Sequence, residues 1–98
     1  MHTYKQRITI NKKTHFLDEN NVWKSSVEEW RRIWADVSVK IYKENAPLYK
    51  FVIKFFSKLP AHFNVTLNGR VFNVTRSPVV DPQKCWIKFF AVEKISGV

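Results

Sequence analysis

Apolar and polar residues alternate along much of this chain with the period of two that is typical of β-strands. Three segments are predicted to be strands, from Arg7 to Ile10, from Lys50 to Phe56 and from Cys85 to Glu93, and the first two show this alternation. β-branched and aromatic residues dominate all three, which suits a half-buried pleated surface. The last segment is apolar on both sides except at Lys88, so we expect it to be a central strand.

The sequence also predicts one β-hairpin with a defined register. Asn68-Gly69 favours a two-residue type I′ turn, because Asn and Gly tolerate the positive φ angles that this turn requires. With Leu67 opposite Arg70, one face of the hairpin carries Phe63, Val65, Leu67, Phe72 and Val74. The other face carries Asn64, Thr66 and Asn73, with Val71 as the exception. A slip by one residue would scramble both faces, so the pattern fixes the pairing.

The stretch from Ser26 to Tyr42 supports two interpretations. Apolar residues at helical spacing, preceded by a possible capping box of Ser26 and Glu29, favour a helix over about residues 27–36. Farther along, Val37 and Val39 alternate with polar residues as they would in a strand. We expect the strand to extend back toward residue 33, with at most a helical turn before it.

These elements predict an all-β fold. Five or six short strands with one hairpin and at most one short helix are typical of a small antiparallel barrel or sandwich with long loops. Glycine occurs only at Gly69 and Gly97, and no Gly-, Ser- or Pro-rich stretch resembles a linker. We therefore expect a single domain over residues 1–98.

Composition narrows the range of partners. The chain is 45% hydrophobic, with eight Phe, four Trp and three Tyr to build a dense core. Its net charge of +9 favours a polyanion or an acidic protein surface as a neighbour. Its apolar runs are far shorter than the roughly 20 residues that span a bilayer, and no signal-peptide core follows the N-terminus. We expect a soluble protein with no membrane partner.

The residues that usually carry catalysis are sparse. His2, His15 and His62 lie far apart in the sequence without the spacing of a metal site, so we interpret them as surface or packing histidines. Cys85 falls inside an apolar strand, which predicts a buried and inert thiol. No phosphate-binding or dinucleotide-binding glycine motif is present. We expect no enzymatic activity, no catalytic or metal-binding residues and no cofactor.

Two further patterns have a structural and a functional interpretation. Asn64-Val65-Thr66 and Asn73-Val74-Thr75 match the glycosylation acceptor pattern, but polar residues on the solvent face of a hairpin explain them as well. Lysines interleaved with aromatic residues, as in Lys54-Phe55-Phe56, could form a stacking platform for nucleic acid. We favour aromatic residues in the core and lysines in water. Arg31-Arg32 beside Trp30 is read as a solvated strand edge.

The order of the motifs resembles that of the phage head–tail joining family, the head-completion or stopper proteins of tailed phages, prophages and gene-transfer particles. The matching segments are Gln6-Arg7-Ile8-Thr9-Ile10, the Asp- and Trp-containing stretch Leu17 to Trp23, Ile33-Trp34-Ala35-Asp36-Val37, the alternating strand Lys50 to Phe55, the hairpin Val65 to Val74, and Asp81 to Glu93. They cover nearly the whole chain in order. The loop from Tyr42 to Leu48 is shorter than its equivalent in the family, so a channel plug supplied by this loop is not implied.

The resemblance implies a structural virion protein that assembles as a ring, twelve-fold by analogy, between the portal or adaptor protein and the tail. Its partners would be further copies of itself, the portal or adaptor, the tail terminator or tail-completion protein, and double-stranded DNA passing non-specifically through the lumen. It would lie in the virion neck, and in the bacterial host cytoplasm during assembly. The candidate interaction residues are Asp18, Glu19, Asn20, Arg31, Arg32, Lys43, Glu44, Asn45, Lys50 and Lys54.

Two alternatives fit the same sequence. A free-standing β-barrel that binds nucleic acid through a basic and aromatic surface would explain the charge and the interleaved lysines. A small partner-binding module of a mobile genetic element, such as a toxin or an inhibitor, is the other. Salt-dependent binding of short single strands by the monomer would separate the first alternative from a connector.

Overall fold

The structure, a computed structural model, describes residues 4–40, 47–54, 59–83 and 85–94. Within these ranges the protein forms seven β-strands and no helix. The strands are β1 (Gln6–Leu17), β2 (Trp23–Lys40), β3 (Leu48–Lys54), β4 (Phe63–Leu67), β5 (Arg70–Val74), β6 (Val79–Asp81) and β7 (Trp86–Glu93). The all-β prediction is therefore confirmed, with the short β6 added to the five or six expected strands. A helix that could cross a membrane is absent from the described part of the chain.

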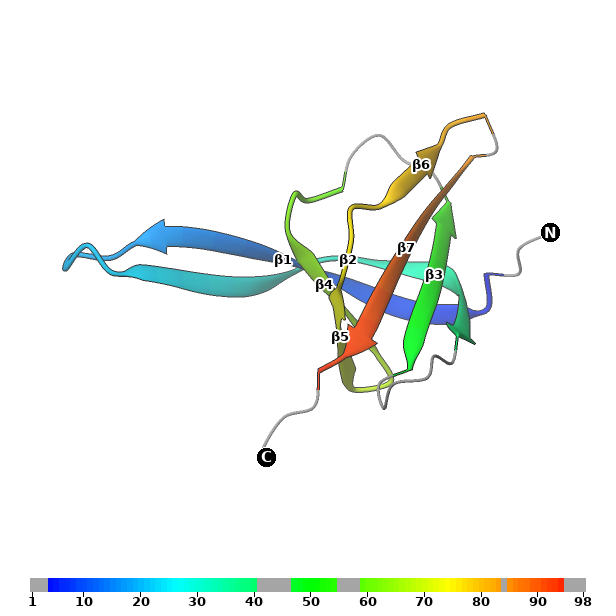
Figure 1. Cartoon of the computed structure of the whole chain (residues 1–98), viewed down its shortest axis with the longest axis horizontal. Coiled ribbons are helices and arrows are strands. Elements are labelled where there is room, and N and C mark those ends of the chain that lie inside the picture. Colours follow the sequence, from blue (N-terminus) through cyan, green and yellow to red (C-terminus); the bar gives the residue numbers. More distant parts are fainter. Residues whose placement is uncertain (1–3, 41–46, 55–58, 84, 95–98) are drawn as a thin grey trace.

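All pairings are antiparallel and belong to one sheet with the order β3-β2-β1-β4-β5-β7-β6. A further pairing joins β3 to β7, so six of the strands close into a ring of hydrogen bonds. β6 pairs with the first part of β7, beyond the part that β5 occupies. Closure leaves these six strands with few free edges, and it creates an enclosed interior (Figure 1).

The core fills this interior. Ile8 and Ile10 from β1, Phe51 and Ile53 from β3, and Phe72 from β5 are completely buried. Phe51 stacks on Phe89 with ring centroids 5.2 Å apart and meets Phe72 edge to face at 5.6 Å. Both contact distances lie within the range that aromatic pairs prefer. The prediction that these aromatic residues turn inward is confirmed for β3, β5 and β7.

The predicted hairpin has the predicted register. β4 and β5 pair through Asn64 and Asn73, Val65 and Phe72, Thr66 and Val71, and Leu67 and Arg70. Asn68 and Gly69 both have positive φ, 52° and 78°, as a type I′ turn requires. Here local turn chemistry and the apolar pattern agree, and the structure follows both.

The local helical interpretation of residues 27–36 is wrong, whereas the expected strand is confirmed and extends back past residue 33 to Trp23. These residues belong to β2, an 18-residue strand that pairs with β1 from Ala35 to Trp23. The physical reason is that β1 continues past Ile10 to Leu17 and supplies a partner for this whole stretch. Cross-strand pairs such as Lys12 with Glu28 then outweigh the weak local preference for helix.

The prediction for Cys85 is also wrong. The residue lies just before β7, not within it, and its side chain is exposed. Its φ is 61°, and its backbone N–H donates to the Pro82 carbonyl oxygen at 3.3 Å. A residue in this left-handed turn conformation cannot continue an extended strand, so the thiol turns to solvent.

Candidate interaction surfaces

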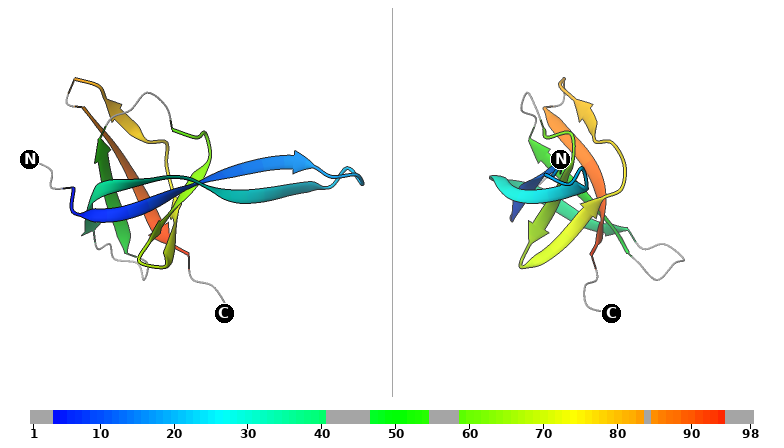
Figure 2. Two further views of the ribbon diagram at one scale, coloured as in Figure 1. Left: turned by 180° about the vertical axis from the view of Figure 1, so that it is seen from behind. Right: turned by 90° about the vertical axis from the view of Figure 1, so that its left-hand side faces the viewer.

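The most distinctive feature of the molecule is a two-stranded arm, defined here as residues 11–29. It comprises the far halves of β1 and β2 and projects from the closed sheet as a long ribbon (Figures 1 and 2). The arm starts at a β-bulge, where the register shifts between Ile10, opposite Arg31, and Asn11, opposite Glu29. The bulge adds Trp30, which packs against the core and turns the ribbon away from the body.

The arm ends in a tight turn built around Asp18. The Asp18 carboxylate accepts hydrogen bonds from the backbone N–H groups of Asn20 at 2.8 Å and Val22 at 3.0 Å, and it forms an ion pair with Lys24 at 3.2 Å. These contacts, with Val22 first, lower the pKa of the Asp18 carboxyl below its ordinary value. Asn21 adopts a positive φ of 60°, which Asn tolerates better than most residues. Asp18 therefore shapes the turn, whereas Glu19 and Asn20 are exposed beside it.

Large apolar side chains are exposed around this turn. We call Phe16, Leu17, the turn 18–21, Val22 and Trp23 the tip. Trp23 is 71% exposed, and the other three apolar side chains are about half exposed. Leu17, Val22 and Trp23 belong to the stretch that resembles the head–tail joining family, but the sequence did not predict that their side chains are exposed. They are exposed because the ribbon that ends at the Asp18 turn projects from the body and has no second layer to cover it (Figure 1).

A polar clamp fixes the root of the arm to the β4–β5 hairpin. The Asn11 side-chain amide donates to Asn64 Oδ1 at 2.8 Å and to Thr66 Oγ1 at 2.9 Å. Lys13 Nζ donates to Asn73 Oδ1 at 3.3 Å. As a result Asn64 is only 7% exposed, which corrects the prediction that it lies on a solvent face. A buried amide cannot be an accessible glycosylation acceptor in the folded chain.

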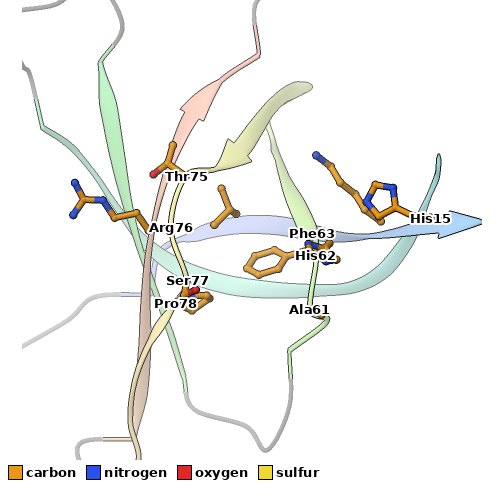
Figure 3. A pocket seen from close by; sticks show the side chains of 10 residues that line it. His15, Ala61, His62, Phe63, Thr75, Arg76, Ser77 and Pro78 are labelled. Carbon is orange, nitrogen blue, oxygen red and sulfur yellow. The ribbon is translucent and has the colours of Figure 1, made fainter. Parts of the chain in front are cut away.

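Beside the clamp lies a pocket of about 400 Å³ between the arm and the body, which we call the notch. Its lining includes Lys13, His15, His62, Phe63, Val74 and Pro78. Figure 3 shows His15 reaching into this region from the arm, with Phe63 and His62 on the opposite strand. The notch thus combines an apolar floor with basic and imidazole groups.

The structure brings together two histidines that are far apart in the sequence. His15 and His62 lie edge to face with ring centroids 5.5 Å apart, and both are exposed. The surface interpretation is confirmed for these two, whereas His2 lies outside the described residues. Within the described ranges, no group of three or more His, Cys, Asp or Glu side chains could hold a metal ion.

A second candidate surface is the outer face of β1, β2, β3 and β7, opposite the core. It carries Arg7, Trp34, Lys50, Lys54, Trp86, Lys88 and Phe90. Three of its cations lie over aromatic rings: Arg7 over Trp34 at 5.3 Å, Lys54 over Tyr4 at 5.8 Å, and Lys88 over Trp86 at 5.8 Å. The interleaved aromatic residues and lysines are therefore divided between the core and the surface. Lys50 and Lys54 point outward while Phe51 and Ile53 point inward.

The remaining predicted interaction residues are scattered. Arg31 lies over the Trp30 ring at 4.9 Å, and Arg32 forms an ion pair with Glu29 at 3.3 Å, so both make local contacts at the root of the arm. Lys43, Glu44 and Asn45 lie outside the described residues. Asp18, Glu19 and Asn20 lie together in the turn that ends the arm, whereas Lys50 and Lys54 belong to β3 in the body, away from that turn (Figure 1).

At the opposite end of the body from the notch, one arginine links three strands. Arg70 Nε donates to Glu93 Oε2 at 2.8 Å, and its Nη2 donates to the other carboxylate oxygen and to the Tyr49 hydroxyl oxygen at 3.1 Å. The hydrogen bonds from Arg70 lower the pKa of the Glu93 carboxyl, and the same bonds raise the pKa of Arg70. This bidentate contact ties β5 to the end of β7 and to β3.

With this geometry established, the fold can be compared with known proteins. It matches two solved structures over nearly its whole length. The solution structure of protein SF1141 from Shigella flexneri 2a has a TM-score of 0.77 at 16% identity, covering 96% of both chains. A chain in the virion of a native gene transfer agent particle has a TM-score of 0.72 at 12% identity, covering 95% of this chain and 96% of the other. At these identities the likeness establishes a shared fold. No family profile matches the sequence, and no curated protein matches it either.

Proposed function

We propose that this protein is a structural subunit of the neck of a tailed phage, prophage or gene-transfer particle, where it joins the head to the tail. In this role, copies of the chain assemble as a ring between the portal or adaptor and the tail terminator or tail-completion protein. DNA passes through the lumen of the ring. The proposed role needs no catalysis, metal or cofactor, and it places the protein in the virion neck and, during assembly, in the host cytoplasm.

The observation that carries this proposal is the full-length structural match to a chain of a gene transfer agent virion. The ordered set of sequence motifs gives support of a different kind, because it rests on residue identities and not on the fold. The arm adds a physical reason. A two-stranded ribbon with exposed Trp23 and Leu17 is poorly supported in an isolated chain and gains contacts in an assembly.

The charge suits a DNA passage. Twelve copies at +9 each would carry on the order of +100, before any acidic partner is counted. Such a field attracts the phosphate backbone without reading bases, since phosphate contacts hold position and carry no sequence information. The outer-face cations Arg7, Lys50, Lys54 and Lys88 are candidates to contribute to it.

Electron microscopy with a portal protein from the same genome tests the proposal. The purified chain is mixed with assembled portal rings, and particles are classified with and without it. We expect an added ring of density coaxial with the portal channel. If portal particles stay bare at micromolar concentrations of the chain, and the chain alone forms no rings, the proposed function is wrong.

One observation favours a second function, nucleic-acid binding by the single chain. The outer face presents cations beside the half-exposed Trp34. Base stacking needs an open aromatic face, however, and Arg7 already lies over Trp34 while Lys88 lies over Trp86 and Phe90. Fluorescence anisotropy with a labelled single-stranded oligonucleotide separates the two roles. Tight, salt-dependent binding by the monomer that Trp34→Ala abolishes would favour this second function over the neck role.

A further inference from the structure

We propose that the tip of one copy docks into the notch of a second copy of this chain, and that this contact, repeated in one direction, builds the ring. The existence of a ring rests on the proposed function. The contact itself rests on three properties of the described residues: exposed apolar surface at the tip, a hollow of suitable size at the notch, and opposite charge at the two places.

The tip has the composition of an interface centre. Trp23 and Leu17 are paired across the two strands, so their side chains lie on the same face of the arm. Val27, also about half exposed, continues that face toward the body. Tryptophan is among the residues that most often dominate binding energy at interfaces, and here it is the most exposed of the large apolar residues in the described ranges. The contacts described within the chain leave this surface open to solvent.

The notch offers a cavity of matching size and lining. Its volume of about 400 Å³ is sufficient for an aromatic side chain and its neighbours, and Phe63, Val74 and Pro78 supply an apolar floor. It lies on the same side of the arm as Trp23, because Lys13, His15 and Leu17 alternate along β1 on one face. A second arm can therefore approach the notch along this exposed face of the first arm.

Charge favours a second copy of this chain as the occupant. The tip carries two carboxylates, Asp18 and Glu19, against the one cation Lys24, whereas the notch carries Lys13 with His15 and His62. Opposite charges attract a tip to a notch, whereas two notches repel each other. Because tip and notch are different patches of one surface, the contact is heterologous. Heterologous contacts generate closed rings when their rotation closes.

Disulfide trapping tests the pairwise contact. Each variant carries one cysteine in a Cys85→Ser background: Asn20→Cys at the tip, or Ser77→Cys at the rim of the notch. The two variants are oxidised as a mixture and each alone, with Gln83→Cys, on the exposed turn before Cys85, as a control position. We expect a tip–notch dimer to form at least tenfold faster in the mixture than any dimer in the separate samples. Equal rates in all samples, or tip–tip dimers alone, would overturn the proposal.

A chain with both cysteines tests the direction of assembly. Within one copy, the first cysteine lies in the turn that ends the arm and the second lies on the body in the segment after β5, so the projecting arm keeps them too far apart to form a disulfide (Figure 1). Contacts repeated in one direction then give a ladder of covalent oligomers on a denaturing gel without reductant. Reciprocal exchange between two copies stops at the dimer. A ladder supports the proposal, and a product that stops at the dimer contradicts it.

A third variant measures what the tip contributes. We expect Trp23→Ala to weaken self-association by about tenfold or more in sedimentation velocity, as loss of an aromatic anchor does. Trp34→Ala is the matched control, because Trp34 is an exposed tryptophan on the body. Equal effects of the two substitutions would overturn the proposal. The two proposals can fail separately. If tip–notch disulfides form a ladder but the portal particles stay bare, the neck role is wrong and the contact stands. If rings bind the portal but no tip–notch disulfide forms, this contact is wrong and the neck role stands.

Discussion

The body and the arm share strands β1 and β2, yet large apolar side chains are buried in the body and exposed in the arm. In the body, Phe51 and Ile53 lie on the inner face of a sheet that closes on itself, and neither is exposed. In the arm, Trp23 and Leu17 occupy equivalent alternating positions on a ribbon without a second layer, and at least half of each is exposed. The difference comes from closure, because β1 loses its β4 partner after Lys12 and β2 has no β3 partner before Ala35.

This contrast indicates which part of the chain supports folding and which part awaits a partner. Closure gives each inward side chain of the body neighbours from several strands. A two-stranded ribbon gives each side chain only its cross-strand neighbours, which contribute roughly 0.2–1 kcal/mol per pair. We therefore expect the stability of the isolated chain to depend on the body, and its assembly to depend on the arm.

The largest expected effect is a core truncation in the body. Phe51→Ala removes contacts with Phe72 and Phe89 from a completely buried site, and we expect it to lower the free energy of unfolding by about 3–5 kcal/mol. Trp23→Ala at the tip should change it by less than about 0.5 kcal/mol, because an exposed side chain has little to lose. Urea unfolding followed by circular dichroism measures both. Similar losses for the two variants would show that the tip is packed in the isolated chain.

The junction between the two regions should give an intermediate effect. Asn11→Ala removes the amide that satisfies Asn64 Oδ1 and Thr66 Oγ1, leaving a buried polar group without its donor. We expect a loss of about 1–3 kcal/mol, together with faster amide exchange in the arm. Thr14→Ala, an exposed position farther along β1, is the matched control and should be close to neutral.

Acid should weaken the two regions through different carboxyls. The pKa of Asp18 in the arm is lowered chiefly by the Val22 backbone N–H, and that of Glu93 in the body chiefly by Arg70. Because each folded pKa lies below the unfolded value, each carboxylate stabilises the fold above its ordinary pKa. That stabilisation is lost as the pH falls through the folded pKa. The urea concentration at the midpoint of unfolding should therefore decrease as the pH is lowered below about 5.

Two substitutions separate these contributions. Arg70→Gln should flatten the acid dependence of the urea midpoint, which reports on the body. Asp18→Asn should leave that dependence largely intact and change only the acid dependence of amide exchange near residues 18–24. An unchanged acid profile in Arg70→Gln would mean that the pairing with Glu93 does not lower its pKa.

The smallest expected effect concerns the exposed thiol of the body. Cys85 should react completely with a thiol reagent in the native state, because its side chain is exposed and lies in a turn before β7. Cys85→Ser should be close to neutral for stability, which also makes it a suitable background for trapping. A thiol that reacts only after urea is added would mean that Cys85 is buried, as the sequence pattern alone suggests.

The sequence predicted the body far better than the arm. Where local turn chemistry and alternation agree, as at Asn68-Gly69, even the register of the hairpin was correct. In β2, alternation competed with a helical spacing and a capping motif. Only the unforeseen extension of β1 to Leu17 decides between them, and that is a pairing between distant residues.

The candidate surfaces were predicted only in part, again because some of them depend on contacts between residues that are distant in the sequence. Asp18, Glu19 and Asn20 were named as candidate interaction residues, and the structure places them in the turn at the end of the arm. The notch was not foreseeable, because it joins His15 to His62 across 47 positions of sequence and depends on how β1 crosses β4. The exposure of Trp23 was not predicted, since a one-dimensional pattern cannot show that a strand lacks a second layer.

Amide hydrogen exchange on the isolated chain and on the portal-bound assembly tests the central claim most directly. We expect peptides from residues 11–29 to exchange quickly in the isolated chain and to become strongly protected in the assembly. Peptides from β3 and β7 should be protected in both. An arm that is already as protected as the body in the isolated chain, or one that gains no protection on assembly, would contradict the account.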